Sequence, residues 1–243
     1  MKSPRTVCVI PARYASSRFP GKPLKSLLGR PMILHTIERA KSAASVDWVI
    51  VATDDERIAC VVRESGHDTV MTPELPSGTH RVAWVARNLN CRFVLNLQGD
   101  EPLIDPNLLN ALVSRLAQGE AEIVTAVHRE DSAELFADRN CVKAVLSSSG
   151  QALYFSRAAI PHDRDGSASS FWRHVGLYGF SHEALQRAVE LPAGELEELE
   201  RLEQLRWLEG GMRIDCVETD WHGYGVDTPS DLRRVEDILR EGQ

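Results

Sequence analysis

The chain has 243 residues, of which 43% are hydrophobic and 26% are charged. These fractions are close to the averages of globular proteins and the length allows a sizeable core, which argues against an intrinsically disordered chain. The formal net charge of −7 argues against general nucleic-acid binding, because nucleic-acid binders usually present a basic face.

Neither hydropathy nor cysteine usage indicates a membrane or an oxidising compartment. No apolar run approaches the roughly 20 residues that cross a bilayer, and the run at 7–10 is too short for the core of a signal peptide. The five cysteines are scattered, and none forms a CxxC pair or a zinc spacing with histidine. We therefore expect a cytoplasmic protein with reduced thiols and no membrane partner.

The first half of the chain alternates short apolar runs with stretches of helical period. One helix is predicted at about 31–44, a second after Asp54, and a third from Pro106. Asp54 is the expected N-cap of the second helix. The predicted strands lie at 7–10, 49–52, 93–97 and 123–127. Continuous apolar strands separated by helices favour an α/β fold with a mainly parallel sheet covered on both faces.

The pattern changes near residue 128. In chain order it predicts a hairpin of strands at 141–146 and 152–155, a mobile loop at 161–172, a helix at about 195–210, a strand at 214–217 and a helix at about 229–241. We expect one domain over 1–243, in which a nucleotide-binding part is interrupted by a substrate-binding or dimerisation insertion at approximately 128–211.

A cationic loop follows the first predicted strand. Arg13, Arg18 and Lys22 lie close together in an otherwise acidic protein, among small residues such as Ala12 and Gly21. In open α/β sheets, ligands bind at the carboxyl ends of the strands, and small residues let backbone N–H groups approach an anion. The loop is neither a GxGxxG motif nor a P-loop. It predicts a triphosphate cradle, with a solvated basic loop as the alternative.

Two acidic turns are candidates for a Mg²⁺ site. Asp100 follows the strand at 93–97 and so lies at the carboxyl edge of the sheet, where a carboxylate near phosphate suggests a hard cation. Asp227 would supply the partner carboxylate, although its Asp-Thr-Pro-Ser-Asp sequence is equally good helix-capping chemistry. For Asp227 the choice between cap and ligand stays open.

The segment from Ser77 to Arg81 precedes a stretch of helical period. Its hydroxyl and N–H groups either cap that helix or lie against a nucleobase, and the capping interpretation is favoured. The eight histidines form no HxxxH or HExxH motif, and the sequence has no GxSxG elbow. Catalytic zinc and acyl hydrolysis therefore find no support.

Several blocks of the sequence resemble the 3-deoxy-manno-octulosonate cytidylyltransferases, or CMP-Kdo synthetases. In family order and over nearly the whole chain they are Ile10–Leu24, Val51–Asp54, Ser77–Thr79 with Arg81, Asn96–Pro102, Ala152–Arg157 with Ile160-Pro161, Arg173–Gly179, Leu202–Arg206 and Gly225–Pro229. The resemblance implies a three-layer α/β/α, Rossmann-like nucleotidyltransferase core with a mixed, mainly parallel sheet, and a smaller part that forms a homodimer. It also implies a Mg²⁺-dependent step of lipopolysaccharide biosynthesis, in which CTP and a sugar acid yield a CMP-sugar acid and pyrophosphate.

The same resemblance implies roles for individual residues. Asp100 and Asp227 are the expected Mg²⁺ ligands and, with Arg13 and Lys22, the expected catalytic residues. The nucleotide is expected to contact Pro11, Ala12, Arg13, Arg18, Lys22, Ser77, Gly78 and Gln98. The acceptor is expected to contact Arg81, Gln98, Arg157, His174, Tyr178, Glu203 and Gln204.

Three features depart from the family pattern. His80 stands where Asp or Glu is expected, the loop from Arg164 to Trp172 is short, and the acidic run from Glu195 to Glu200 is unfamiliar. Because these features fall on the acceptor side, the alternative is the same CTP chemistry on another small anion, a phosphonate or a different ulosonate, in a specialised pathway. A second class, a nucleotide-binding regulatory protein without turnover, would be excluded by CTP-dependent pyrophosphate release.

Overall fold

The computed structural model describes residues 5–15, 19–165 and 170–241. The chain divides into two compact units. The N-terminal unit comprises Met1–Asn110 and Gly223–Gln243, and the central unit comprises Ala111–His222, within which the expected insertion at 128–211 falls. Among the described residues, no helix is long and apolar enough to span a membrane.

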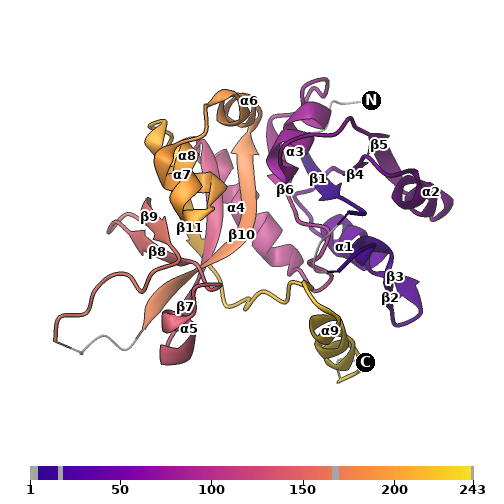
Figure 1. The fold of residues 1–243 in the computed structure, drawn as a ribbon. Coiled ribbons are helices and arrows are strands. Elements are labelled where there is room, and N and C mark those ends of the chain that lie inside the picture. Colours follow the sequence, from indigo (N-terminus) through magenta and orange to yellow (C-terminus); the bar gives the residue numbers. More distant parts are fainter. Residues whose placement is uncertain (1–4, 16–18, 166–169, 242–243) are drawn as a thin grey trace. The chain divides into compact units, whose positions relative to one another are not determined.

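Parallel strands form the sheet of the N-terminal unit, in the order β6-β1-β4-β5 (Figure 1). Their bounds are Thr6–Ala12 for β1, Trp48–Thr53 for β4, Asp68–Met71 for β5 and Phe93–Asn96 for β6. Strand β1 is buried along its whole length and is paired on both sides. This confirms the prediction that its apolar run is an interior strand. Strand β5 was not predicted, because it has no buried residue and begins with two polar ones, which gives little apolar signal.

Helices of the N-terminal unit connect these strands. Their bounds are Met32–Lys41 for α1, Glu56–Glu64 for α2, Gly78–Ala86 for α3 and Pro229–Glu241 for α9; a 3₁₀ turn, η1, spans Lys22–Leu24, and a short hairpin pairs Ser26–Leu27 (β2) with Arg30–Pro31 (β3). The predicted cap of α2 is corrected by one residue. Asp55, not Asp54, accepts the N–H of Arg57, whereas the Asp54 carboxylate pairs with Arg81.

A small apolar cluster attaches the C-terminal segment to the N-terminal unit. Phe19, Met32, Val226 and Val235 are buried together in it. The cluster brings the turn before α9 to the rest of the unit, although the two segments are separated by more than a hundred residues of sequence. The burial of these apolar side chains stabilises the attachment of the turn.

The central unit contains a mixed arrangement of strands. β7 (Ile123–Glu130) pairs in parallel with β11 (Ile214–Glu218) and antiparallel with β10 (Phe171–Ser181), which pairs antiparallel with β8 (Lys143–Leu146). β8 and β9 (Ala152–Ser156) form the predicted hairpin. Helices flank a mixed, mainly parallel sheet, which confirms the predicted α/β class.

Helix α4 (Pro106–Ala117) begins in the N-terminal unit and ends in the central unit, whose other helices are α5 (Ala133–Ala137), α6 (His182–Glu190), α7 (Glu195–Glu200) and α8 (Glu203–Glu209). The single helix predicted at 195–210 is therefore wrong. Arg201 adopts a left-handed conformation with φ of 54° and separates α7 from α8. The continuous helical period gave no sign of this break, since Arg is a good helix former.

Candidate functional site

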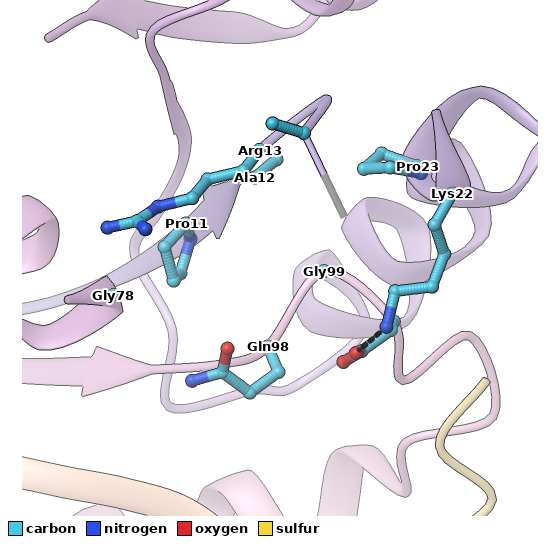
Figure 2. Close-up of a pocket in the computed structure, with 10 residues that line it drawn as sticks. Pro11, Ala12, Arg13, Lys22, Pro23, Gly78, Gln98 and Gly99 are labelled. Carbon is cyan, nitrogen blue, oxygen red and sulfur yellow. Dashed lines mark hydrogen bonds and ion pairs between the residues drawn. The ribbon is translucent and has the colours of Figure 1, made fainter. Parts of the chain in front are cut away.

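A pocket of about 420 Å³ lies at the carboxyl ends of β1 and β6 in the N-terminal unit (Figure 2). Its volume is in the range of small-molecule sites. The lining residues are Pro11, Ala12, Arg13, Ala15, Lys22, Pro23, Gly78, Gln98, Gly99 and Asp100. The pocket thus combines the cationic loop, the first turn of α3 and the acidic turn after β6, as the rule for open α/β sheets predicts.

Lys22 lies between the two predicted metal ligands. Its Nζ is 2.5 Å from Oδ2 of Asp100 and 3.1 Å from Oδ1 of Asp227. The Lys22 side chain is only 14% exposed, and burial opposes its charge, but the attraction of Asp100 and Asp227 outweighs burial and raises the pKa of Lys22. The structure therefore brings both carboxylates to one positively charged group, across 127 residues of sequence (227 − 100).

The cap of α9 leaves the Asp227 carboxylate facing Lys22. Oδ2 of Asp231 accepts the N–H groups of Asp227 and Thr228, and the N–H of Asp231 is donated to the hydroxyl of Thr228. The Val226 N–H in turn donates to the Asp100 carbonyl at 2.9 Å, which joins the two acidic turns. Thr228 and Asp231 therefore supply the capping chemistry that the sequence had left open for Asp227.

Close packing holds the Asp100 turn. A Cβ on Gly99 would lie 3.0 Å from Cδ1 of Ile33 and 3.3 Å from the carbonyl oxygen of Pro11, so only glycine fits without displacement. The buried hydroxyl of Thr36 donates to the Gly99 carbonyl at 3.3 Å. Sequence reasoning missed Thr36. The available signal was a hydroxyl beside Ile33 and Ile37 on an otherwise apolar helix face.

Arg13 extends away from Lys22 in the pocket (Figure 2). Its Nη2 is 2.5 Å from the carbonyl oxygen of Leu75, in the segment before α3. The loop that carries both cations is closed by a hydrogen bond from the Gly21 N–H to the Tyr14 carbonyl at 2.9 Å. Arg18 belongs to the predicted cradle but lies outside the described residues.

The start of α3 forms one side of the pocket. Oγ of Ser77 accepts the N–H of His80 and lies 2.8 Å from its Nδ1, so the predicted N-cap is confirmed and His80 takes part in it. A Cβ on Gly78 would be 3.4 Å from Pro11 and 3.8 Å from Oε1 of Gln98. The residues expected around the cytidine thus lie together, and the capping and nucleotide-binding interpretations of Ser77 are compatible.

Arg81 lies in the interior of the N-terminal unit. Its side chain is fully buried, its Nη2 is 2.5 Å from Oδ2 of Asp54, and its Nη1 contacts the hydroxyl of Thr72. This guanidinium therefore joins α3 to the end of β4. The expected contact of Arg81 with the acceptor stays a prediction: two of its nitrogens are engaged by Asp54 and Thr72, and its buried Nε has no hydrogen-bond partner within the described residues.

In the central unit, two buried polar atoms among the expected acceptor residues lack a hydrogen-bond partner within the described residues. They are the hydroxyl of Tyr178 and Nε2 of Gln204. Burial raises the pKa of Tyr178, whose ring lies 5.0 Å from the ring of Trp207 in α8. An unpaired buried polar group costs about 1–3 kcal/mol, so a polar ligand that pairs with these two atoms would recover that cost.

His174 and Arg157, also expected near the acceptor, are both engaged by the protein. Nε2 of His174 lies 2.9 Å from Oγ1 of Thr125. The guanidinium of Arg157 donates to the main-chain carbonyls of Glu200 and Arg139. The structure therefore places both residues in the central unit, where His174 is held by β7 and Arg157 by the end of α7.

The donor set around Lys22 is suitable for a hard divalent cation. Mg²⁺ is bound in many phosphate-transfer sites by one or two carboxylates, with phosphate and water oxygens completing its shell. The carboxylates of Asp100 and Asp227 both contact the Lys22 ammonium, so they lie close enough together to face one cation. No cluster of three or more acidic, histidine or cysteine side chains able to hold a metal occurs in the part of the chain that the structure describes. The residues present therefore fit a metal that the substrate helps to bind.

Comparisons with known proteins agree over nearly the whole chain. A family model described as "Cytidylyltransferase" matches residues 7–214. A 3-deoxy-manno-octulosonate cytidylyltransferase of Anaeromyxobacter sp. (strain K) is 48% identical, with 96% of this chain and 97% of the relative covered. One of Nitratidesulfovibrio vulgaris (strain DP4) is 46% identical, with 99% of each covered. A solved structure of CMP:2-keto-3-deoxy-manno-octonic acid synthetase in complex with CTP superposes with a TM-score of 0.94 at 38% identity, covering 98% of this chain and 100% of that one.

Proposed function

Because the chain belongs to the family of 3-deoxy-manno-octulosonate cytidylyltransferases, we propose that it transfers CMP from CTP to 3-deoxy-manno-octulosonate and releases pyrophosphate. The observation that carries this proposal is the position of Lys22 between Asp100 and Asp227, at the edge of a pocket on the carboxyl side of a parallel sheet. A cation and two carboxylates at that edge suit a nucleoside triphosphate with its metal.

The pocket offers separate places for the base and for the phosphates. Pro11, Gly78 and Gln98 lie together, and Gly78, which has no side chain, lets the backbone approach a cytosine ring there. Arg13 and Lys22 supply the positive charge for the triphosphate. Arg13 can hold phosphate oxygens through two parallel N–H bonds, while Lys22 acts as a point charge.

The carboxylates of Asp100 and Asp227 are the groups that would hold Mg²⁺. When bound, this ion would neutralise charge on the phosphates. Lys22 stabilises negative charge on the departing pyrophosphate in this proposal. Its contacts to Asp100 and Asp227 hold the ammonium beside the acidic turns, and the triphosphate competes with those carboxylates for it.

The transfer itself needs no protein nucleophile. An acceptor hydroxyl oxygen attacks the α-phosphorus of CTP in line, a new phosphorus–oxygen bond forms, the bond to the β-phosphate oxygen breaks, and the hydroxyl proton is released. Catalysis of this kind depends mainly on positioning and on charge stabilisation. The unpaired Tyr178 hydroxyl and Gln204 amide support acceptor binding in the central unit, since hydroxyl and carboxylate groups of a sugar acid can pair with both.

We also propose that the enzyme acts as a homodimer, as the resemblance to the family implies. Leu153 in β9 and Leu199 in α7 support this, because they are large apolar side chains that are 58% and 73% exposed. Light scattering should give twice the chain mass of 27.1 kDa. A mass of one chain at assay concentration would contradict the proposal.

The substitution Asp100→Asn tests the acidic turn. It keeps the side-chain shape and removes the charge, so we expect pyrophosphate release to fall by roughly 10²–10³ while CTP binding survives in part. Asp237→Asn is the matched control, because Asp237 lies on α9 in the same unit and is 68% exposed. A fully active Asp100→Asn enzyme would refute the proposed role.

A screen of acids tests the acceptor. Purified protein with CTP and Mg²⁺ should release pyrophosphate with 3-deoxy-manno-octulosonate. Release with a phosphonate or another ulosonate, and none with 3-deoxy-manno-octulosonate, would overturn the proposed acceptor and keep the transfer chemistry. Absence of release with every acid would overturn the proposed function as a whole.

A further inference from the structure

The central unit contains a fully buried lysine that contacts no carboxylate at hydrogen-bond distance within the described residues. Lys143, in β8, is 0% exposed, and its Nζ donates to the main-chain carbonyls of Asp138, Cys141 and Arg157 at 2.8, 2.7 and 2.6 Å. An ammonium has three N–H donors, so these carbonyls satisfy it completely. Lysine is almost never fully buried without such partners. Lys143 therefore ties the segment before β8 to the end of β9.

The end of β9 is also joined to the end of α7. Oε1 of Glu200 accepts the Ser156 hydroxyl at 2.5 Å, and Oε2 accepts the Arg157 N–H at 2.9 Å. Nε of Arg157 donates in return to the Glu200 carbonyl at 2.8 Å. The connection is reciprocal, because each residue supplies both a side-chain and a main-chain group. Favourable charge adds to it, since a guanidinium lies at the carboxyl end of a helix.

The contacts between Arg157 and Glu200 lie just before two of the expected acceptor residues in the sequence. Arg201 adopts the left-handed conformation immediately after Glu200, and α8 then starts at Glu203 and Gln204. The N-cap residue Leu202 provides no side-chain hydrogen bond to α8. Two sets of contacts therefore hold the turn between α7 and α8. Arg206 of α8 donates to both carboxylate oxygens of Glu197 in α7, at 2.5 and 2.7 Å, and the network of Lys143, Ser156, Arg157 and Glu200 holds the end of α7 at the turn itself.

We propose that Lys143 and Glu200 are positioning residues for the acceptor pocket. Through Arg157 and the turn at Arg201, they fix the start of α8 and thereby the buried, unpaired amide of Gln204. This inference rests on the proposed function. Neither side chain contacts the acceptor in it; they act on the orientation of the residues that do. Burial also lowers the pKa of Lys143, in keeping with a desolvated ammonium held by the main chain.

Two substitutions test the network, Lys143→Met and Glu200→Gln. Each removes a charge and hydrogen bonds without adding bulk. We expect the KM for the acceptor to rise about ten- to a hundredfold, because small displacements of positioning groups carry costs of this order. The Kd for CTP, measured by calorimetry, should stay within about twofold, because the network lies in the central unit and the nucleotide pocket in the N-terminal unit.

Glu198→Gln is the matched control, since Glu198 is an exposed residue of the same helix α7 and the chemical change is the same. It should leave both constants unchanged. If Lys143→Met does not fold, Glu200→Gln alone decides the question. An unchanged acceptor KM in a folded variant, or equal losses of acceptor and CTP binding, would overturn the inference. Wild-type protein that binds CTP but releases no pyrophosphate with any acid would overturn the proposed function first, and this inference with it.

Discussion

The imidazole of His174 gives the central unit a stability that depends on pH. Nε2 of His174 lies 2.9 Å from Oγ1 of Thr125, which also lies 2.8 and 3.2 Å from the carbonyl oxygens of Leu177 and Val175. Because burial disfavours the charged imidazolium, the neutral ring is the form that fits this site. The ring of Phe155 lies against it at 4.9 Å. Burial lowers the pKa of His174 from 6.5 to about 3.

The sign and size of the effect follow from this pKa. The unfolded chain gains a proton at His174 near pH 6.5, whereas the folded chain gains it only near pH 3, so stability falls as the pH falls between these values. One pKa unit corresponds to about 1.4 kcal/mol. Lowering the pH from about 7 to about 5 should therefore reduce the free energy of unfolding by about 2 kcal/mol through this residue alone.

Urea denaturation at both pH values tests this magnitude. We expect His174→Gln to be less stable at neutral pH but to lose most of the 2 kcal/mol pH dependence, since glutamine does not titrate. His67→Gln is the control. Burial, with Lys41 adding to it, also lowers the pKa of His67, but His67 lies nearer the surface and should contribute less. The same pH dependence in wild type and His174→Gln would refute the buried, neutral imidazole.

Two further substitutions test packing and charge. Gly99→Ala should destabilise the protein by about 1–3 kcal/mol and weaken CTP binding, because the alanine Cβ would lie 3.0 Å from Cδ1 of Ile33. Urea denaturation measures the stability and calorimetry measures the Kd for CTP. Unchanged values of both would contradict the close approach. Asp215→Asn should lower the free energy of unfolding by about 1–3 kcal/mol in urea denaturation, because this 1% exposed carboxylate accepts from Arg115 and Arg213 at 2.6 and 2.7 Å. A loss below about 0.5 kcal/mol, the level of a surface substitution, would show that the two guanidinium groups are rehydrated without cost.

Local sequence predicted most elements of the fold correctly. The apolar run at 7–10 and the hairpin around Gly150 were identified because burial on both faces, or a turn between two short strands, leaves a pattern within a few residues. The wrong assignment of the α2 cap was an error of one residue. Asp54 and Asp55 are equivalent as caps by composition, and only the ion pair of Asp54 with the buried Arg81 explains which of them caps α2.

The candidate site divides in the same way. The pocket that we propose for the nucleotide was predictable, because its residues follow strand ends that must meet at one edge of a parallel sheet. The contacts of Arg81 and Arg157 within the protein were not predictable, because a guanidinium that faces a ligand and one that binds the protein's own oxygens look the same in the sequence. Their partners are recognisable only when distant segments are in place.

The amino-acid sequence by itself determined much of the order of strands and helices and the family, and it predicted the edge of the sheet where the pocket lies, since these depend on short-range patterns and on motifs. Only the tertiary structure decided that Lys22 lies between Asp100 and Asp227, and that Lys143 is enclosed by main-chain carbonyls. Such contacts join residues far apart in the chain. Their geometry depends on how whole elements pack, which no local pattern of residues records.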